Sequence, residues 1–179
     1  MVTYHVYSDE SREAAFNAIA GGLFILPFFL FSAIAGQLAD GHDKARIIRI
    51  VKTAEIAIMA FGAAGLLLSS VPLLLAALFA MGVHSSFFGP IKYAILPQHL
   101  HRDEVLGGTG LVEAGTYGAI LLGTIVGGII PPHVAAGMVL VVAGIGWLTG
   151  RQVPPAPPSA DVPRSEEHTS ELQSPVVIS

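Results

Sequence analysis

Charged side chains lie inside or at the ends of long apolar stretches, and four of them are the residues best placed to do chemistry. Lys52 and Glu55 fall within one stretch, Lys92 lies near the end of another, and Glu113 opens a third. A charge near the centre of a bilayer costs roughly 2.5–3.5 kcal/mol, so a charge retained there is by default a hypothesis for function. The chemistry that these charges favour is electrostatic binding of an ionic group.

Lys52 and Glu55 are three residues apart, so they share one helical face and can form an intramembrane charge pair. Lys52 is also only about 8 Å from the start of its apolar stretch at 1.5 Å per residue. Its ammonium group can therefore extend to the membrane surface instead. Both interpretations stay open at this point.

Lys92 and Glu113 lie near the same membrane surface on consecutive apolar stretches, so the two side chains could meet. One interpretation is a structural pair between helices. The other is a place on a substrate path, to which Tyr93 would also belong. His84 has the small neighbours Gly82 and Ser85, which suit either a cavity or close helix packing.

The composition places the chain in a membrane. Of its 179 residues, 53% are hydrophobic and only 12% are charged, whereas a soluble domain carries about 25% charged residues. The net charge of −4 decides little. The fold class we predict is an all-α integral membrane protein.

Known catalytic patterns are missing from the sequence, which has no nucleophile-elbow, phosphate-loop, zinc-protease or dinucleotide-binding motif. It also contains no cysteine, so it can form neither a disulfide nor a thiolate metal site. His99 and His101 make a poor metal site without further ligands. We expect no catalysis, no metal, no cofactor and no nucleic-acid partner.

Five apolar stretches are long enough to cross a bilayer, which takes about 20 residues of helix. Gly89 and Pro90 should break the third stretch near its end, and the glycine-rich residues 107–110 should form a loop before the fourth. The predicted transmembrane helices span residues 16–39, 47–70, 73–96, 111–130 and 134–150.

The connection between the first two stretches is short, charged and turn-prone. It contains Gly36, Asp40, Lys44 and Arg46. It resembles the signature between the second and third helices of the major facilitator superfamily, Gly-x-Leu-Ala-Asp followed by a basic cluster. The resemblance implies that these residues serve conformational switching.

Longer stretches are similar to one branch of that superfamily, the bacterial lysophospholipid transporters, some of which are fused to an acyltransferase and an acyl-carrier-protein synthetase. The Pro-rich segment at 154–158, which follows the last apolar stretch, is also similar to the fused forms. The similar stretches are residues 22–27, 88–98, 110–116 and 119–123.

The resemblance implies a twelve-helix transporter that works by alternating access, of which this chain would hold helices two to six. Residues 1–15 would then be the end of helix one and an external loop, and residues 16–151 part of the N-terminal transmembrane half. Residues 152–163 read as a Pro-rich linker. Residues 164–179 resemble a translated sequencing adapter and not native protein.

The function implied is movement of lysophospholipid, in the form of lysophosphatidylethanolamine, across the bacterial inner membrane for reacylation. The substrate would bind between the two halves, so the C-terminal half is an expected partner and the chain alone should transport nothing. The alternative is a proton-coupled facilitator for a small solute or drug.

Gly123, Gly127 and Gly128 form a small-residue face in the fourth stretch, and the first two make a GxxxG pair. Such faces let membrane helices pack closely. The segment also resembles a motif of facilitator antiporters, but Thr124 stands where that motif has proline. Helix packing is therefore the role we predict.

Basic residues predict the orientation of the spans. Lys44, Arg46 and Arg49 lie at the first connection and Arg102 lies two spans later, while the alternate connections at 69–72 and 131–133 contain no Lys or Arg. Loops rich in Lys and Arg face the cytoplasm.

We therefore predict that His42 is cytoplasmic and His133 external. Single cysteines placed at these positions should react differently with an impermeant thiol reagent added from outside. Cys at 133 should be labelled and Cys at 42 protected, because the reagent cannot cross the bilayer. The opposite labelling pattern would reverse the orientation.

Overall fold

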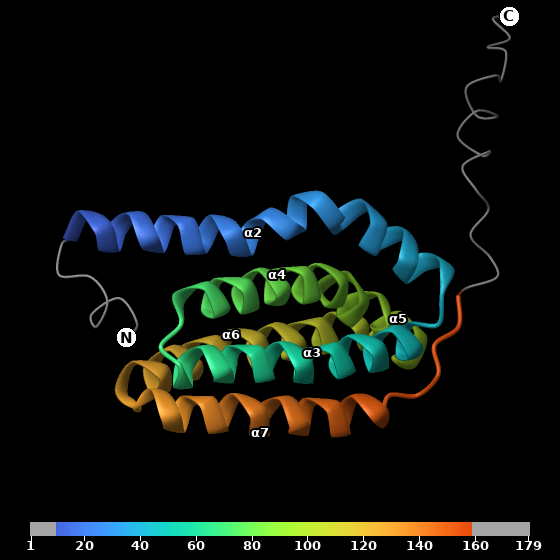
Figure 1. Cartoon of the computed structure of the whole chain (residues 1–179). Coiled ribbons are helices and arrows are strands. Elements are labelled where there is room, and N and C mark those ends of the chain that lie inside the picture. Colours follow the sequence, from blue (N-terminus) through green and yellow to red (C-terminus); the bar gives the residue numbers. More distant parts are fainter. Residues whose placement is uncertain (1–9, 159–179) are drawn as a thin grey trace, which may run out of the picture.

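The computed structural model describes residues 10–158, and within this range the chain is all-helical (Figure 1). Five helices are long and apolar enough to cross a membrane, as the sequence predicts. A short helix of four residues, α5, joins two of them. The helices are α2 (Glu10–Gly41), α3 (Lys44–Leu67), α4 (Val71–Ala94), α5 (Leu96–His99), α6 (Val105–Ile129) and α7 (Pro132–Arg151).

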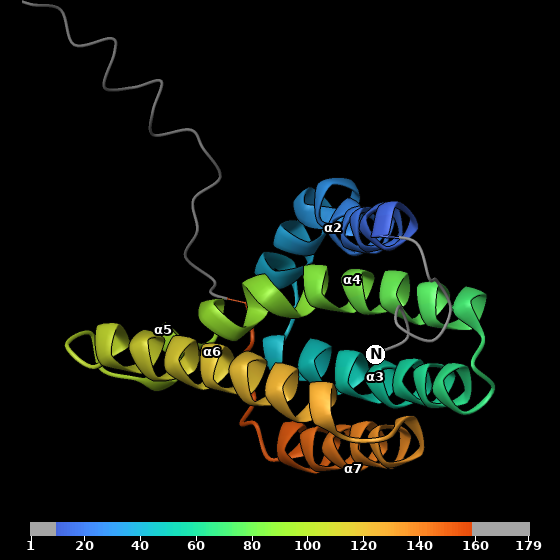
Figure 2. The same cartoon turned by 90° about the vertical axis from the view of Figure 1, so that its left-hand side faces the viewer.

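Four of the helices stack in the order α2, α4, α3 and α7, and α6 lies beside them (Figures 1 and 2). Contacts between α4 and both α2 and α3, and between α3 and α7, hold this stack together. The junction of α2 with α3, helix α5 and the end of α7 all lie at one end of the bundle (Figure 1). The basic residues of the connections therefore share one end.

The connection between α2 and α3 is shorter than the sequence predicts. Gly36 and Asp40 lie in the last turns of α2, while Lys44 and Arg46 lie in the first turn of α3. Only two residues stay outside the helices. The sharp reversal is possible because Asp43 caps α3, its Oδ1 accepting hydrogen bonds from the N–H groups of Ala45 and Arg46 at 2.9 and 3.3 Å.

Three predicted breaks in the helices are wrong. Residues 10–13 were expected in an external loop but begin α2. Residues 107–110 lie inside α6 and not in a loop. Helix α4 continues through Gly89 and Pro90. In an apolar bilayer an unpaired backbone group is so costly that it outweighs the weak turn preference of glycine and the single hydrogen bond lost at proline.

Close approach of α2 to α4 depends on Gly82. A Cβ atom at this position would lie 2.5 Å from the carbonyl oxygen of Phe24 and 3.0 Å from Cγ of Pro27. Pro27 is itself fully buried in this contact. The proline inside α2 therefore packs into a space that only glycine leaves open.

Residues 153–158 return across the basic end of the bundle. The backbone of Ala156 accepts a hydrogen bond from the N–H of Lys44 at 2.9 Å and donates one to Oδ1 of Asp43 at 3.1 Å. Arg49 binds the carbonyl of Val153, and Gln98 binds that of Pro157. The segment has no regular secondary structure, and these hydrogen bonds hold it against α3 and α5.

A small hydrophobic core lies under this returning segment. Ala156 is only 1% exposed and belongs to this core. The remaining buried members come from α2, α3, α4 and the residue that follows α4, and they are Ala39, Ile47, Ile48, Val51, Ile91 and Ile95. Residues 1–9 and 159–179, which include the predicted remnant of helix one and the adapter-like tail, lie outside the described residues.

The Oδ1 of Asp43 accepts hydrogen bonds from three backbone N–H groups, those of Ala45, Arg46 and Ala156. The hydrogen bond from Ala156 is the largest cause that holds the pKa of the Asp43 carboxyl below its usual value, followed among the lowering causes by the bonds from Arg46 and Ala45. A carboxyl whose pKa is lower in the folded state stabilises that state above the unfolded pKa, and the contribution is lost as the pH falls through the folded value.

We predict that Asp43→Ala lowers the melting temperature of the chain in detergent by roughly 2–4 °C, because α3 loses its cap and residues 153–158 lose their anchor. Asp103→Ala, which removes an exposed acid from the α5–α6 connection, is the matched control and should change little. The difference between wild type and Asp43→Ala should also shrink below about pH 4. Equal melting temperatures at neutral pH would refute the anchoring role.

Candidate functional site

The residues of the α2–α3 signature lie close together in the chain but in different surroundings. Asp40 and Arg46 are exposed, whereas Lys44 is only 5% exposed. Within the described residues, neither cation forms an ion pair with Asp40. Arg46 lines one rim of a cavity of about 750 Å³ between α2, α3 and α4, beside His42.

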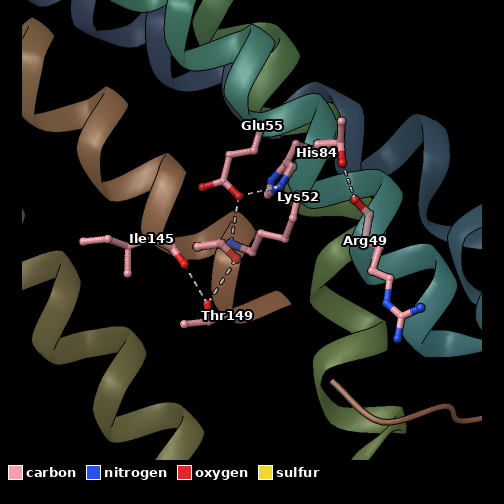
Figure 3. Close-up of polar contacts among 8 residues, drawn as sticks. Arg49, Lys52, Glu55, His84, Ile145 and Thr149 are labelled. Atoms are coloured by element: carbon pink, nitrogen blue, oxygen red, sulfur yellow. Dashed lines mark hydrogen bonds and ion pairs between the residues drawn. The ribbon is translucent and has the colours of Figure 1, made fainter. Parts of the chain in front are cut away.

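Lys52 and Glu55, both on α3, form a direct pair (Figure 3). The distance from Lys52 Nζ to Glu55 Oε2 is 2.7 Å, and both side chains are mostly buried. The ammonium group also lies 4.7 Å from the ring centre of Phe88. Lys52 is thus directed into the protein and not to the membrane surface.

His84 joins this pair from α4. Its Nε2 lies 3.2 Å from the same oxygen of Glu55, and its side chain is 4% exposed (Figure 3). The imidazole also stacks on Phe88, with ring centres 5.8 Å apart. From the sequence, His84 stood out only as a histidine among small residues. Its distance from Glu55 depends on how α4 is rotated against α3, which the sequence does not reveal.

A second polar cluster connects α4 with α6. Lys92 Nζ donates to the hydroxyl of Thr116 at 3.3 Å and lies 4.7 Å from the ring centre of Tyr93. The hydroxyl of Tyr93 donates to the carboxylate of Glu113. Lys92 and Glu113 therefore meet through Tyr93 and Thr116, and not as the direct ion pair that the sequence suggested.

The glycines of α6 do not pack against another helix within the described chain. A Cβ atom added at Gly123, Gly127 or Gly128 would meet nothing within 4 Å. The reason is that α6 stands apart from α3 and α7, which leaves a cavity of about 410 Å³ lined by Gly123, Gly127 and Glu55. A role of these glycines in helix packing stays a prediction.

Comparison with known proteins identifies the family. Residues 7–178 match the Major Facilitator Superfamily. Similar relatives are proteins named lysophospholipid transporter LplT from Salmonella newport, Salmonella heidelberg and Salmonella agona. Each is 34% identical over 118 residues, which cover 65% of this chain and 28% of the relative.

The aligned part of the chain thus spans less than a third of the length of these relatives. No solved structure is significantly similar to it. The match to the superfamily covers nearly the whole sequence, and the five apolar helices agree with it. This multi-pass membrane protein therefore belongs to the major facilitator superfamily of transporters.

Proposed function

We propose that the chain is part of a transporter that moves lysophospholipids across the bacterial inner membrane for reacylation. The observation that carries the proposal is the cluster between α4 and α6, in which Lys92 and Glu113 are held close without neutralising each other. The relatives named as lysophospholipid transporters support the same substrate class.

The partners of the two charges explain why the cluster suits a zwitterion. Lys92 contacts a hydroxyl and an aromatic ring, both of which are neutral. Glu113 accepts a hydrogen bond from a phenol, which is also neutral. Lys92 can therefore bind a phosphate and Glu113 an ammonium group, and the headgroup of lysophosphatidylethanolamine carries both.

The position of the cluster suits a place on the path of the substrate. Lys92 lies in the last turn of α4, and Glu113 lies in the first half of α6, so the cluster is near the basic end of the bundle. Transporters of this kind bind their substrate between two halves near the midplane. We infer that the headgroup passes Lys92 and Glu113 as it leaves toward the cytoplasmic leaflet, and that the C-terminal half supplies the remaining contacts.

Charge reversal tests this proposal in an intact homologous transporter, at the positions equivalent to Lys92 and Glu113. We expect Lys92→Glu and Glu113→Lys each to reduce uptake of labelled lysophosphatidylethanolamine by at least about tenfold, since each repels one charge of the headgroup. The protein with both exchanges should insert normally and stay inactive. Its two charges are then swapped, so that each meets the headgroup charge of the same sign.

The exposed Arg102 offers a matched control, since Arg102→Glu reverses a charge on the same end of the bundle outside the cluster. Its uptake should stay near that of wild type. Restored uptake in the double exchange would mean that Lys92 and Glu113 form a structural pair. The proposed contact with the headgroup would then be wrong.

We also propose that Asp40, Lys44 and Arg46 act in conformational switching and not in substrate binding. They lie at the end of the bundle, at the junction that residues 153–158 cross. In an intact homologue, Asp40→Asn should slow transport while the affinity for substrate stays within about threefold. Turnover rates and equilibrium binding, measured on the same preparation, distinguish a role in switching from a role in substrate binding. Weaker binding with normal turnover contradicts the switching role.

A further inference from the structure

We propose that His84 and Glu55 form a proton-binding site that links the packing of α4 to that of α7. Three residues from two helices make up the site, and Lys52 is the third. The cluster lies apart from Lys92 and Glu113. The proposal therefore does not depend on which substrate the transporter carries.

The two groups that would share the proton are already in contact. Nε2 of His84 is 3.2 Å from Oε2 of Glu55, but the two are not aligned as a hydrogen bond, and Nδ1 has no hydrogen-bond partner. Buried polar atoms in native proteins are almost always hydrogen-bonded, so an unsatisfied imidazole calls for an explanation. A histidine that exchanges a proton during the working cycle provides one.

Cavities reach the pair from both sides of α3. His84 lines the cavity of about 750 Å³ between α2, α3 and α4. Glu55 lines the cavity of about 410 Å³ between α3, α6 and α7. The imidazole can take up a proton from the first cavity, and the carboxylate can release it into the second.

Through Lys52, the protonation state of His84 can affect how the helices pack. With a neutral imidazole, Lys52 and Glu55 balance each other. A proton on His84 creates a second cation beside Oε2, which then competes with the 2.7 Å contact to Lys52. The carboxylate of Glu55 would then move toward His84 on α4, and its ion pair with Lys52 would weaken.

The side chain of Lys52 lies directly against α7. A Cβ atom at Gly146 would be 3.3 Å from its Nζ, and a Cβ atom at Gly150 would be 3.1 Å from its Cγ. These two glycines therefore leave the space that the lysine fills. A displacement of the Lys52 side chain would change its contacts with Gly146 and Gly150. Protonation of His84 on α4 would in this way alter the packing of α7 against α3.

Other charged groups around the site are more distant or already engaged. His42 and Arg46 line the cavity that His84 faces. On α7, Arg151 lies over the ring of Trp147, and on α6, Glu113 is bound to Tyr93. Within the described residues, the ion pairs of Glu55 are those with Lys52 and His84.

Imidazole NMR of the ¹⁵N-histidine-labelled chain in lipid nanodiscs tests the proposal, with the His84 signal assigned by its loss in His84→Gln. We expect His84 to gain a proton between about pH 9 and pH 5. In Glu55→Gln its proton affinity should fall by at least about tenfold, because the neighbouring negative charge is lost. In Lys52→Met the affinity should rise, because the competing cation is removed.

His133 is exposed in the first turn of α7, away from the cluster, and serves as the internal control, since its signal should respond to pH in the same way in all variants. Glu55→Gln and Lys52→Met should change the proton affinity of His84 in opposite directions. If one variant fails to fold, the other still tests the proposal. An imidazole of His84 that stays neutral throughout the range in wild type would overturn the proposal. Unchanged titration of His84 in the variants would overturn it as well.

Discussion

A charged side chain in an apolar bilayer must find its partner within the protein, and the arrangement of α3 follows from this constraint. Lys52 and Glu55 on α3 satisfy each other at 2.7 Å, and both side chains are mostly buried. Phe88 and His84 cover the pair from α4. The glycines of α7 receive the stem of Lys52. This explains why α3 is the helix that packs against both α4 and α7.

The same constraint determines what could be predicted from the sequence. The five spans follow from the length of the apolar stretches, because a bilayer demands about 20 apolar residues per helix. The helix ends were predicted less well, since residues 107–110 and Pro90 suggested breaks on local propensity alone. Propensities of about 1 kcal/mol per glycine come from helices in water. In a bilayer the backbone has no water to bind, so the helix continues.

The polar clusters were predicted only in part, and the reason is geometric. Lys52 and Glu55 lie on one helix, where a spacing of three residues fixes their proximity. His84 and Glu55 lie on different helices, and so do Tyr93 and Glu113, so their contacts depend on the rotation and tilt of each helix. Similarly, nothing in a Pro-rich exit indicates that Ala156 would be buried against Asp43. Contacts between separate elements of this kind could not be predicted from the sequence.

Helix α4 carries a member of each polar cluster, and this connects the two. His84 and Lys92 are eight residues apart, which is about 12 Å along a helix and an offset of about 80° around its axis, and they contact different helices. His84 contacts Glu55 on α3, whereas Lys92 contacts Thr116 on α6. A movement of α4 along α3 that breaks the first contact would also move Lys92, which lies on the same helix. Under the two proposals above, a change of charge at His84 would alter the geometry that a headgroup meets at Lys92, without any direct contact between the two residues.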